Sequence, residues 1–118
     1  MDDAFAQRFV TKWVDAWNAH DIEAILSHFL DDVIFSSPLA LQIIGGSDGV
    51  IRGKEDLRTY WSEGLRRSPL LHFEIENLYV GVNTLVIHYR KHSGGLVNEV
   101  LTFDGPFVIE GHATYLVS

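Results

Sequence analysis

The sequence predicts an α+β fold in which helices come first and an antiparallel sheet follows. Up to residue 67, apolar residues recur at steps of three and four, which is the period of one helix face. After Pro69 they recur at every second position, as in strands, and short turns at 81–83, 93–95 and 105–106 separate these stretches. We therefore expect helices packed across one face of a curved antiparallel meander.

Three helices are expected. The first begins near Ala4, and its apolar side chains follow at steps of four. The second is short and capped by Asp21, and the third runs over 54–67 until Ser68 and Pro69 end it. Their apolar faces carry Phe5, Phe9, Trp13 and Trp17 in the first, Ile22, Ile25, Leu26 and Phe29 in the second, and Leu57, Tyr60, Trp61 and Leu65 in the third.

A short strand is expected at 33–35, between the second and third helices. Proline cannot donate a hydrogen bond to a sheet, so Pro38 should end this strand at about Ser37. The segment 39–52 is interpreted as a long loop, because it is interrupted by glycines, although it is also rich in Leu, Ile and Val. A loop of this composition is expected to be a flap over a pocket or a subunit contact.

Four strands are expected after Pro69. A slip of the alternation at Asn77 and Leu78 indicates a bulge in the first of them. In the last, strict alternation places Phe107, Ile109, Ala113 and Tyr115 on one face. The four strands are expected at 71–80, 84–92, 96–104 and 107–116.

Glu99 stands out in the strand at 96–104. Alternation places it on the same face as Val97, Leu101 and Phe103, which are all apolar. Burying an ionised carboxylate costs several kcal/mol or more, so this group must find a partner, take a proton or line a cavity. From the residues alone, three alternatives stay open: a glutamate that reaches solvent at an edge, an ion pair with an arginine such as Arg52 or Arg90, and a pocket carboxyl.

Composition excludes several classes of function. The chain has 118 residues, which fits one domain over 1–118. It has no cysteine, so disulfides and thiolate chemistry are excluded, and its net charge of −7 argues against nucleic-acid binding. No apolar run approaches the roughly 20 residues that span a membrane. Together with the acidic N-terminal residues, these features lead us to expect a cytoplasmic protein without a membrane segment.

Histidine spacing gives no metal site. His88 and His92 share one face of a predicted strand, but a rise of roughly 3.3 Å per residue separates them by more than about 12 Å. The other four histidines show no paired ligand spacing. We therefore expect neither a metal nor another cofactor.

Several motifs, in this order, resemble the SnoaL-like branch of the nuclear transport factor 2-like superfamily. The first is Trp-x-x-Ala-Trp-Asn-x-His-Asp at 13–21, followed by Phe-Ser-Ser-Pro at 35–38. The third is Gly-Lys-x-x-Leu-Arg-x-Tyr-Trp at 53–61, which precedes the meander. The resemblance covers about Phe5 to Tyr115. It implies a cone-shaped α+β barrel that encloses an apolar pocket, commonly in a homodimer.

The family includes ketosteroid isomerase, polyketide cyclases and an epoxide hydrolase, besides non-catalytic domains. Alignment on ketosteroid isomerase places Glu99 where that enzyme has a protonated aspartate, so the resemblance implies a pocket acid/base. Ser37 falls where the isomerase has its aspartate base, and Trp13 where it has its oxyanion-hole tyrosine. Since serine and tryptophan cannot do that chemistry, steroid isomerisation itself is not expected.

The resulting hypothesis is a binding protein for a small apolar molecule, with isomerase, cyclase or hydrolase chemistry at Glu99. The alternative is a non-catalytic domain that binds a hydrophobic ligand or forms a dimeric interaction module. For the homodimer, the open face of the sheet should pack on a second copy through residues such as Val86, Val100 and Val108. The expected substrate-binding residues are Trp13, Trp17, Phe35, Ser37, Tyr60, Trp61 and Phe103.

Overall fold

A computed structural model describes residues 1–117 of the chain. Helices and strands follow one another in the order α1, α2, β1, α3, β2, α4 and then β3 to β6. Their bounds are α1 Asp3–Asn18, α2 Ile22–Leu26, β1 Phe29–Ser36, α3 Pro38–Ile43, β2 Val50–Arg52, α4 Lys54–Arg67, β3 Phe73–Val80, β4 Thr84–Lys91, β5 Leu96–Asp104 and β6 Phe107–Tyr115.

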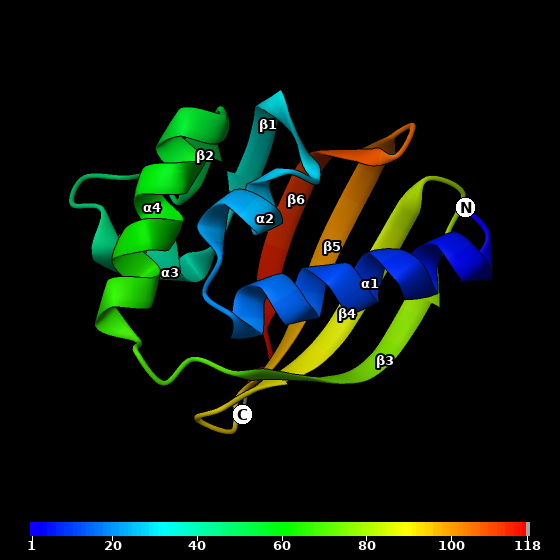
Figure 1. The fold of residues 1–118 in the computed structure, drawn as a ribbon. Helices are drawn as coiled ribbons and strands as arrows, with labels where there is room; N and C mark the ends of the chain where they lie inside the picture. The colour runs from blue at the N-terminus through cyan, green and yellow to red at the C-terminus, as the bar shows by residue number, and fades with distance from the viewer. Residues whose placement is uncertain (118) are drawn as a thin grey trace.

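One six-stranded sheet forms the body of the molecule, in the order β2-β1-β6-β5-β4-β3. Strands β3 to β6 form the expected antiparallel meander, and β1 adds to β6 in parallel. Helices α1, α2 and α4 lie in front of the sheet in Figure 1, and the sheet bends around them. The predicted α+β fold is therefore confirmed, as a curved sheet whose outer strands β2 and β3 do not pair with each other.

Helix α1 is fixed at both ends by side chains that the sequence supplies locally. Asp2 caps its first turn by accepting a hydrogen bond from the Phe5 amide. At its last residue, the Asn18 amide group exchanges two hydrogen bonds with the Phe73 backbone, at 3.1 and 2.8 Å. These two bonds pin the end of α1 to the start of β3, and thereby set where the Trp13 and Trp17 side chains lie.

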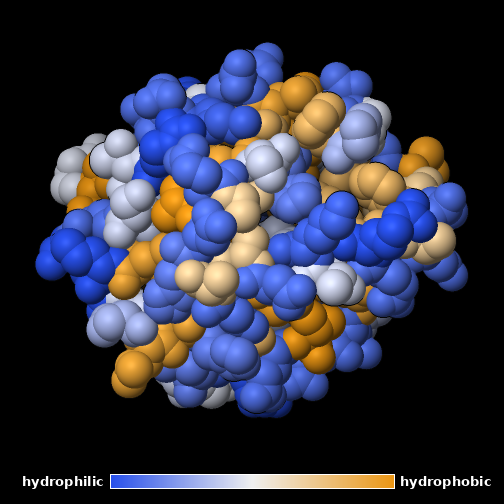
Figure 2. All heavy atoms as spheres, viewed as in Figure 1, coloured by the Kyte–Doolittle hydropathy of each residue, from blue (hydrophilic) through white to orange (hydrophobic). Residues whose placement is uncertain are grey.

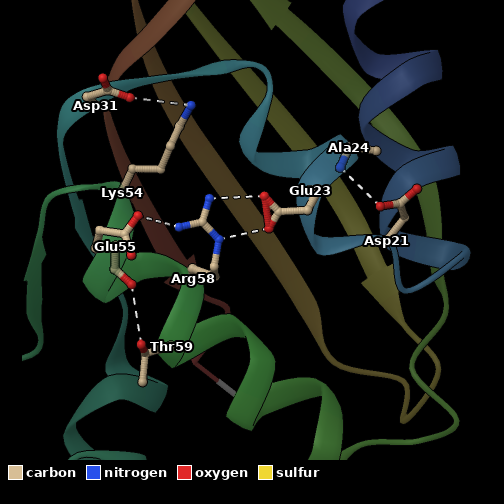
Figure 3. Close-up of polar contacts among 8 residues, drawn as sticks. All are labelled: Asp21, Glu23, Ala24, Asp31, Lys54, Glu55, Arg58 and Thr59. Atoms are coloured by element: carbon tan, nitrogen blue, oxygen red, sulfur yellow. Dashed lines mark hydrogen bonds and ion pairs between the residues drawn. The ribbon is translucent and has the colours of Figure 1, made fainter.

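Helix α4 is tied to α2 by charged side chains. The Arg58 guanidinium donates to both carboxylate oxygens of Glu23, at 2.8 and 3.0 Å, and to Glu55 at 2.7 Å. Figure 3 shows this network, with Lys54 reaching Asp31 of β1 beside it. The bidentate geometry is more specific than an ordinary surface ion pair, and it holds α4 in place over the sheet.

Two predictions for the first half of the chain are wrong. Phe29 belongs to strand β1 and not to the second helix, because the chain turns directly after Leu26 and pairs with β6. The segment 39–52 is not a long loop. It contains most of helix α3, capped by Ser37 with Pro38 in its first turn, and the short strand β2, which pairs with β1. Its apolar residues are explained by these two elements.

The last strand departs from strict alternation. The register between β5 and β6 shifts between Thr102 and Phe103, so Val108 instead of Ile109 faces the core and is 0% exposed. The prediction of one common face is therefore wrong for Phe107 and Ile109, whereas it holds for Ala113 and Tyr115. For the same reason Val108 does not lie on the open face of the sheet. The bulge predicted at Asn77 and Leu78 of β3 is present one residue earlier.

Aromatic side chains dominate the core between helices and sheet. Trp17 contacts Trp61 edge to face with ring centroids 5.1 Å apart, and Trp61 contacts Phe35 in the same manner at 5.3 Å. On the helix side, Figure 2 shows mostly hydrophilic residues with apolar ones scattered between them. Within residues 1–117, no helix is long and apolar enough to cross a membrane.

Candidate functional site

A cavity of about 410 Å³ lies between the inner face of the sheet and helices α3 and α4. Its volume is within the range of small-molecule sites, roughly 300–1,000 Å³. The floor comes from β4, β5 and β6, one side from α4, and the rim from α3 and the hairpin between β4 and β5. The lining residues are Trp17, Phe35, Ser37, Leu39, Gln42, Tyr60, Trp61, Gly64, Leu65, Ser68, Leu71, Phe73, Tyr89, Lys91, His92, Ser93, Glu99, Ala113 and Tyr115.

Glu99 forms part of the floor of this cavity. It is 4% exposed, and the alternation of β5 places it on the buried face, as the sequence predicts. Its Oε2 atom is buried and has no hydrogen-bond partner within residues 1–117. Neither arginine that could have paired with it does so: Arg52 binds Asp48 and Arg90 binds Glu76. The ion-pair and edge interpretations of Glu99 are therefore excluded.

Burial without a partner determines the protonation of Glu99. Removal from water disfavours the charged form and raises the pKa of this carboxyl from 4.5 to about 8. At neutral pH the group is therefore mostly a neutral acid that can donate a hydrogen bond into the cavity. An acid with a pKa close to ambient pH can also take the proton back, which is the property of an acid/base catalyst.

Small residues create the space beside Glu99. Ala113 on β6 is its direct partner across the ladder, and its single methyl group leaves the carboxyl uncovered. Gly64 on α4 lines the opposite side. Next to Ala113, Gly111 allows Phe35 and Leu101 to pack closely, because a Cβ there would lie 3.1 and 3.0 Å from their side chains. The cavity is thus open at Glu99 and closely packed just beyond it.

Hydroxyl groups surround the carboxyl without binding it. Burial raises the pKa of Tyr60 to about 12, and also raises the pKa of Tyr89 and Tyr115. The Ser37 hydroxyl is hydrogen bonded to Tyr115 at 3.2 Å and accepts from the Leu39 amide at 3.2 Å as the cap of α3. At neutral pH, these hydroxyls can donate hydrogen bonds to a ligand but cannot remove its protons.

The expected site residues separate into two groups. Glu99, Trp17, Phe35, Ser37, Tyr60 and Trp61 all line the cavity. Trp13 does not: it lies one helical turn before Trp17, is 1% exposed, and packs on Phe73 and Tyr89 in the core. Phe103 lies further along β5 and packs edge to face on Phe5 and Phe9, away from the cavity.

Sequence reasoning missed several residues of the cavity. Leu39 and Gln42 fall in the segment that the sequence predicts as a loop, although they belong to α3 at the rim. Lys91 and His92 lie at the β4–β5 turn, where a polar residue is normally solvated, and no local signal distinguished them. Alternation in β4 and β6 could have identified Tyr89 and Tyr115, since both fall on the inner face. Among residues 1–117, no three His, Asp or Glu side chains converge as metal ligands.

The chain matches the family model described as a SnoaL-like domain over residues 10–116. The chain belongs to the SnoaL-like family. A SnoaL-like protein of unknown function from Burkholderia thailandensis is 46% identical and superimposes with a TM-score of 0.92, with 99% of each chain covered. No curated protein matches the chain significantly.

More distant structures share the fold of this SnoaL-like chain. An NTF2-like protein of unknown function from Cytophaga hutchinsonii is 10% identical with a TM-score of 0.73, covering 94% of this chain and 89% of its own. AclR, a proposed hydroxylase from Streptomyces galilaeus, is 17% identical with a TM-score of 0.75, covering 98% and 91%. A proposed polyketide cyclase from Sinorhizobium meliloti is 13% identical with a TM-score of 0.71, covering 89% and 92%. At these identities the likeness establishes the fold alone.

Proposed function

We propose that this SnoaL-like chain binds a small apolar molecule in the cavity and that Glu99 exchanges a proton with it. The observation that carries the proposal is a carboxyl group, buried and without a partner, in the floor of an aromatic-walled cavity. Burying such a group costs stability, and perturbed carboxyls of this kind are characteristic of catalytic sites. The names of two structural neighbours, a proposed hydroxylase and a proposed polyketide cyclase, also favour small-molecule chemistry.

The chemistry would proceed at a carbonyl or epoxide oxygen. In its protonated form Glu99 donates a hydrogen bond to that oxygen and stabilises the charge that develops on it. In its ionised fraction the same carboxylate removes an α-proton from a ketone and, after exchange with solvent, returns a proton to the enolate carbon, so that no net charge or atom is gained. Much of the surrounding wall is aromatic, and a hydrogen bond is stronger in surroundings of low polarity than in water. Isomerisation, ring closure and ring opening each need such a donor, so all three classes remain within the proposal. No cofactor takes part in it.

The test is proton exchange in deuterated water. A panel of cyclic ketones is incubated with the wild-type chain, and loss of α-proton signals is followed by NMR; a parallel panel of epoxides is assayed for diol. We expect exchange or hydrolysis with the wild type and at least about a hundredfold less with Glu99→Gln. Glu74→Gln on β3, which alters an exposed carboxylate outside the cavity, is the matched control and should retain the rate.

The second candidate is a domain that binds a hydrophobic ligand without turning it over. The observation that favours it is Ser37, whose hydroxyl is engaged as a helix cap and by Tyr115 and so offers no second acid/base group. Ligand binding that persists in Glu99→Gln, with no turnover by the wild type on either panel, would support this candidate and contradict the catalytic one.

A further inference from the structure

We infer that the ligand of this cavity is an aromatic or alicyclic carboxylate, with its carboxylate at Lys91 on the rim and its ring directed toward Glu99. The inference rests on the proposed function, since it concerns the occupant of the same cavity. It is carried by the position of Lys91, by the distribution of charge around the cavity, and by the way the β4–β5 turn holds this side chain.

Lys91 faces the cavity from the end of β4. One face of that strand carries every second side chain, namely Ile87, Tyr89 and Lys91. Ile87 is the direct ladder partner of Glu99. Lys91 is four residues further along, which places its backbone about 13 Å from the level of Glu99 at roughly 3.3 Å per residue. To this separation we assign a ring system that carries one polar substituent at each end.

The charge of the cavity is opposite to that of the chain. The protein has sixteen acidic residues and a net charge of −7, yet among the described residues Glu99 is the only Asp or Glu in the lining. With that carboxyl protonated, Lys91 is left as the charged group of the cavity, and His92 stands beside it. An acidic protein with a cationic cavity favours an anionic ligand there, because such a ligand is repelled elsewhere on the surface.

Lys91 is available to such a ligand. Within the part of the chain that the structure describes it has no ion-pair partner, whereas Lys54 reaches Asp31 and Arg58 binds two glutamates. Its ammonium group instead lies over the Tyr115 ring, 4.7 Å from the ring centroid. This contact directs the Nζ atom over a cavity residue and leaves its hydrogen-bond donors open to a carboxylate.

The turn after β4 fixes the lysine in this position. The Lys91 amide donates to the Gly95 carbonyl, and the Gly94 amide donates to the Lys91 carbonyl, each at 2.8 Å. Gly94 has a positive φ of 97°, which favours glycine. A Cβ at Gly95 would lie 3.0 Å from the Lys91 Cε atom, so the lysine stem runs directly over the Gly95 backbone. Gly95→Ala therefore shifts the ammonium group while keeping its charge.

The test compares two probes that differ in one charge, 6-hydroxy-2-naphthoate and its methyl ester, by calorimetric titration at low salt. We expect the wild type to bind the acid about fivefold more tightly than the ester, and added salt to remove this preference.

Lys91→Met should reduce acid binding to the level of the ester without changing ester binding. Lys91→Arg should retain the preference, and Gly95→Ala should weaken it. Lys12→Met, an exposed change on α1, is the control and should leave both affinities unchanged.

Three outcomes overturn the inference, and they differ in what they say about the proposed function. Equal binding of acid and ester by the wild type, or equal weakening of both in Lys91→Met, contradicts the carboxylate at Lys91 alone. Glu99-dependent proton exchange would survive that result. Binding of neither probe contradicts both the inference and a cavity that accepts small apolar ligands.

Discussion

Glu99 on β5 lies directly opposite Ala113 on β6, so the buried carboxyl faces a methyl group where the sheet could have placed a larger side chain. This pairing leaves the carboxyl both desolvated and accessible from the cavity. A larger residue at 113 would cover Glu99, and an arginine there would neutralise it. The properties proposed for the site therefore depend on this pair as much as on the glutamate itself.

Ala113→Leu should close the cavity while the fold persists. The added side chain projects over Glu99, so affinity for the ester probe should fall at least about tenfold. The free energy of unfolding should change by less than about 3 kcal/mol, because the added atoms enter an existing space. Thr114→Leu, the neighbouring change on the outer face, is the control and should leave affinity unchanged. Undiminished binding in Ala113→Leu would place the ligand outside this cavity.

Glu99→Gln should alter the pH dependence of stability. The folded-state pKa of Glu99 is raised to about 8 from 4.5, so the unfolded chain releases this proton first as the pH rises. The contribution of this proton to the free energy of unfolding is therefore fully present below pH 4.5, and it is lost as the pH rises through 8. Glutamine has no such proton. In urea denaturation, the variant should match the wild type at about pH 4.5 and exceed its unfolding free energy by roughly 2–5 kcal/mol at about pH 9.

The same measurement on Glu74→Gln provides the control, because this glutamate on β3 is exposed. Its difference from the wild type should be the same at both pH values. A constant difference for Glu99→Gln as well would show that Glu99 titrates alike in folded and unfolded chains, which is incompatible with a desolvated carboxyl.

Ser37→Ala tests whether this residue has a structural or a chemical role. The serine caps α3 and is hydrogen bonded to Tyr115, so its loss should reduce the free energy of unfolding by about 1 kcal/mol. Ser37→Thr keeps the hydroxyl and should recover most of that loss. Affinity for the ester probe should stay within about twofold in both variants. A large loss of binding or of proton exchange with unchanged stability would instead give Ser37 a direct role on the ligand.

The open face of the sheet is proposed to bind a second copy of the chain. Tyr79, Val86 and Val100 follow one another across β3, β4 and β5 and project from the face without helices, and Tyr79 is 59% exposed. Sedimentation equilibrium at micromolar concentration should give about twice the 13.3 kDa of one chain. Val100→Glu should give monomers, and Leu70→Glu, an exposed change outside that sheet, should not. A monomeric wild type would disprove this proposal.

Much of the fold could be predicted because it follows from local patterns. Caps at Asp2 and Asp21, the period of the helix faces and the alternation around Glu99 are all encoded within a few residues. The parallel pairing of β1 with β6 joins segments about eighty residues apart, and no local pattern specifies it. The register shift in β6 is also invisible locally, although one residue of shift exchanged the faces of Ile109 and Val108.

The residues of the candidate site also divide into those that a local pattern reveals and those whose position depends on distant segments. Glu99 could be located because one charged residue in an apolar alternation has few explanations. Trp13 and Trp17 lie on the same apolar face of α1 and look equivalent in the sequence. Only Trp17 reaches the cavity, because it lies one turn further along the helix axis. Lys91 could not be found, because a turn lysine is normally solvated and its orientation depends on Tyr115 and Gly95.

The pKa of Glu99 distinguishes a neutral acid in the cavity from an ionised carboxylate. The side-chain carboxyl carbon can be followed by NMR across a pH range that brackets both the ordinary and the raised pKa, with Glu99→Gln to assign its signal. We predict a midpoint of about 8, set by burial without a partner. A midpoint near the ordinary value of 4.5 would show that the carboxylate is hydrated or paired in solution, and would contradict a neutral acid in the cavity.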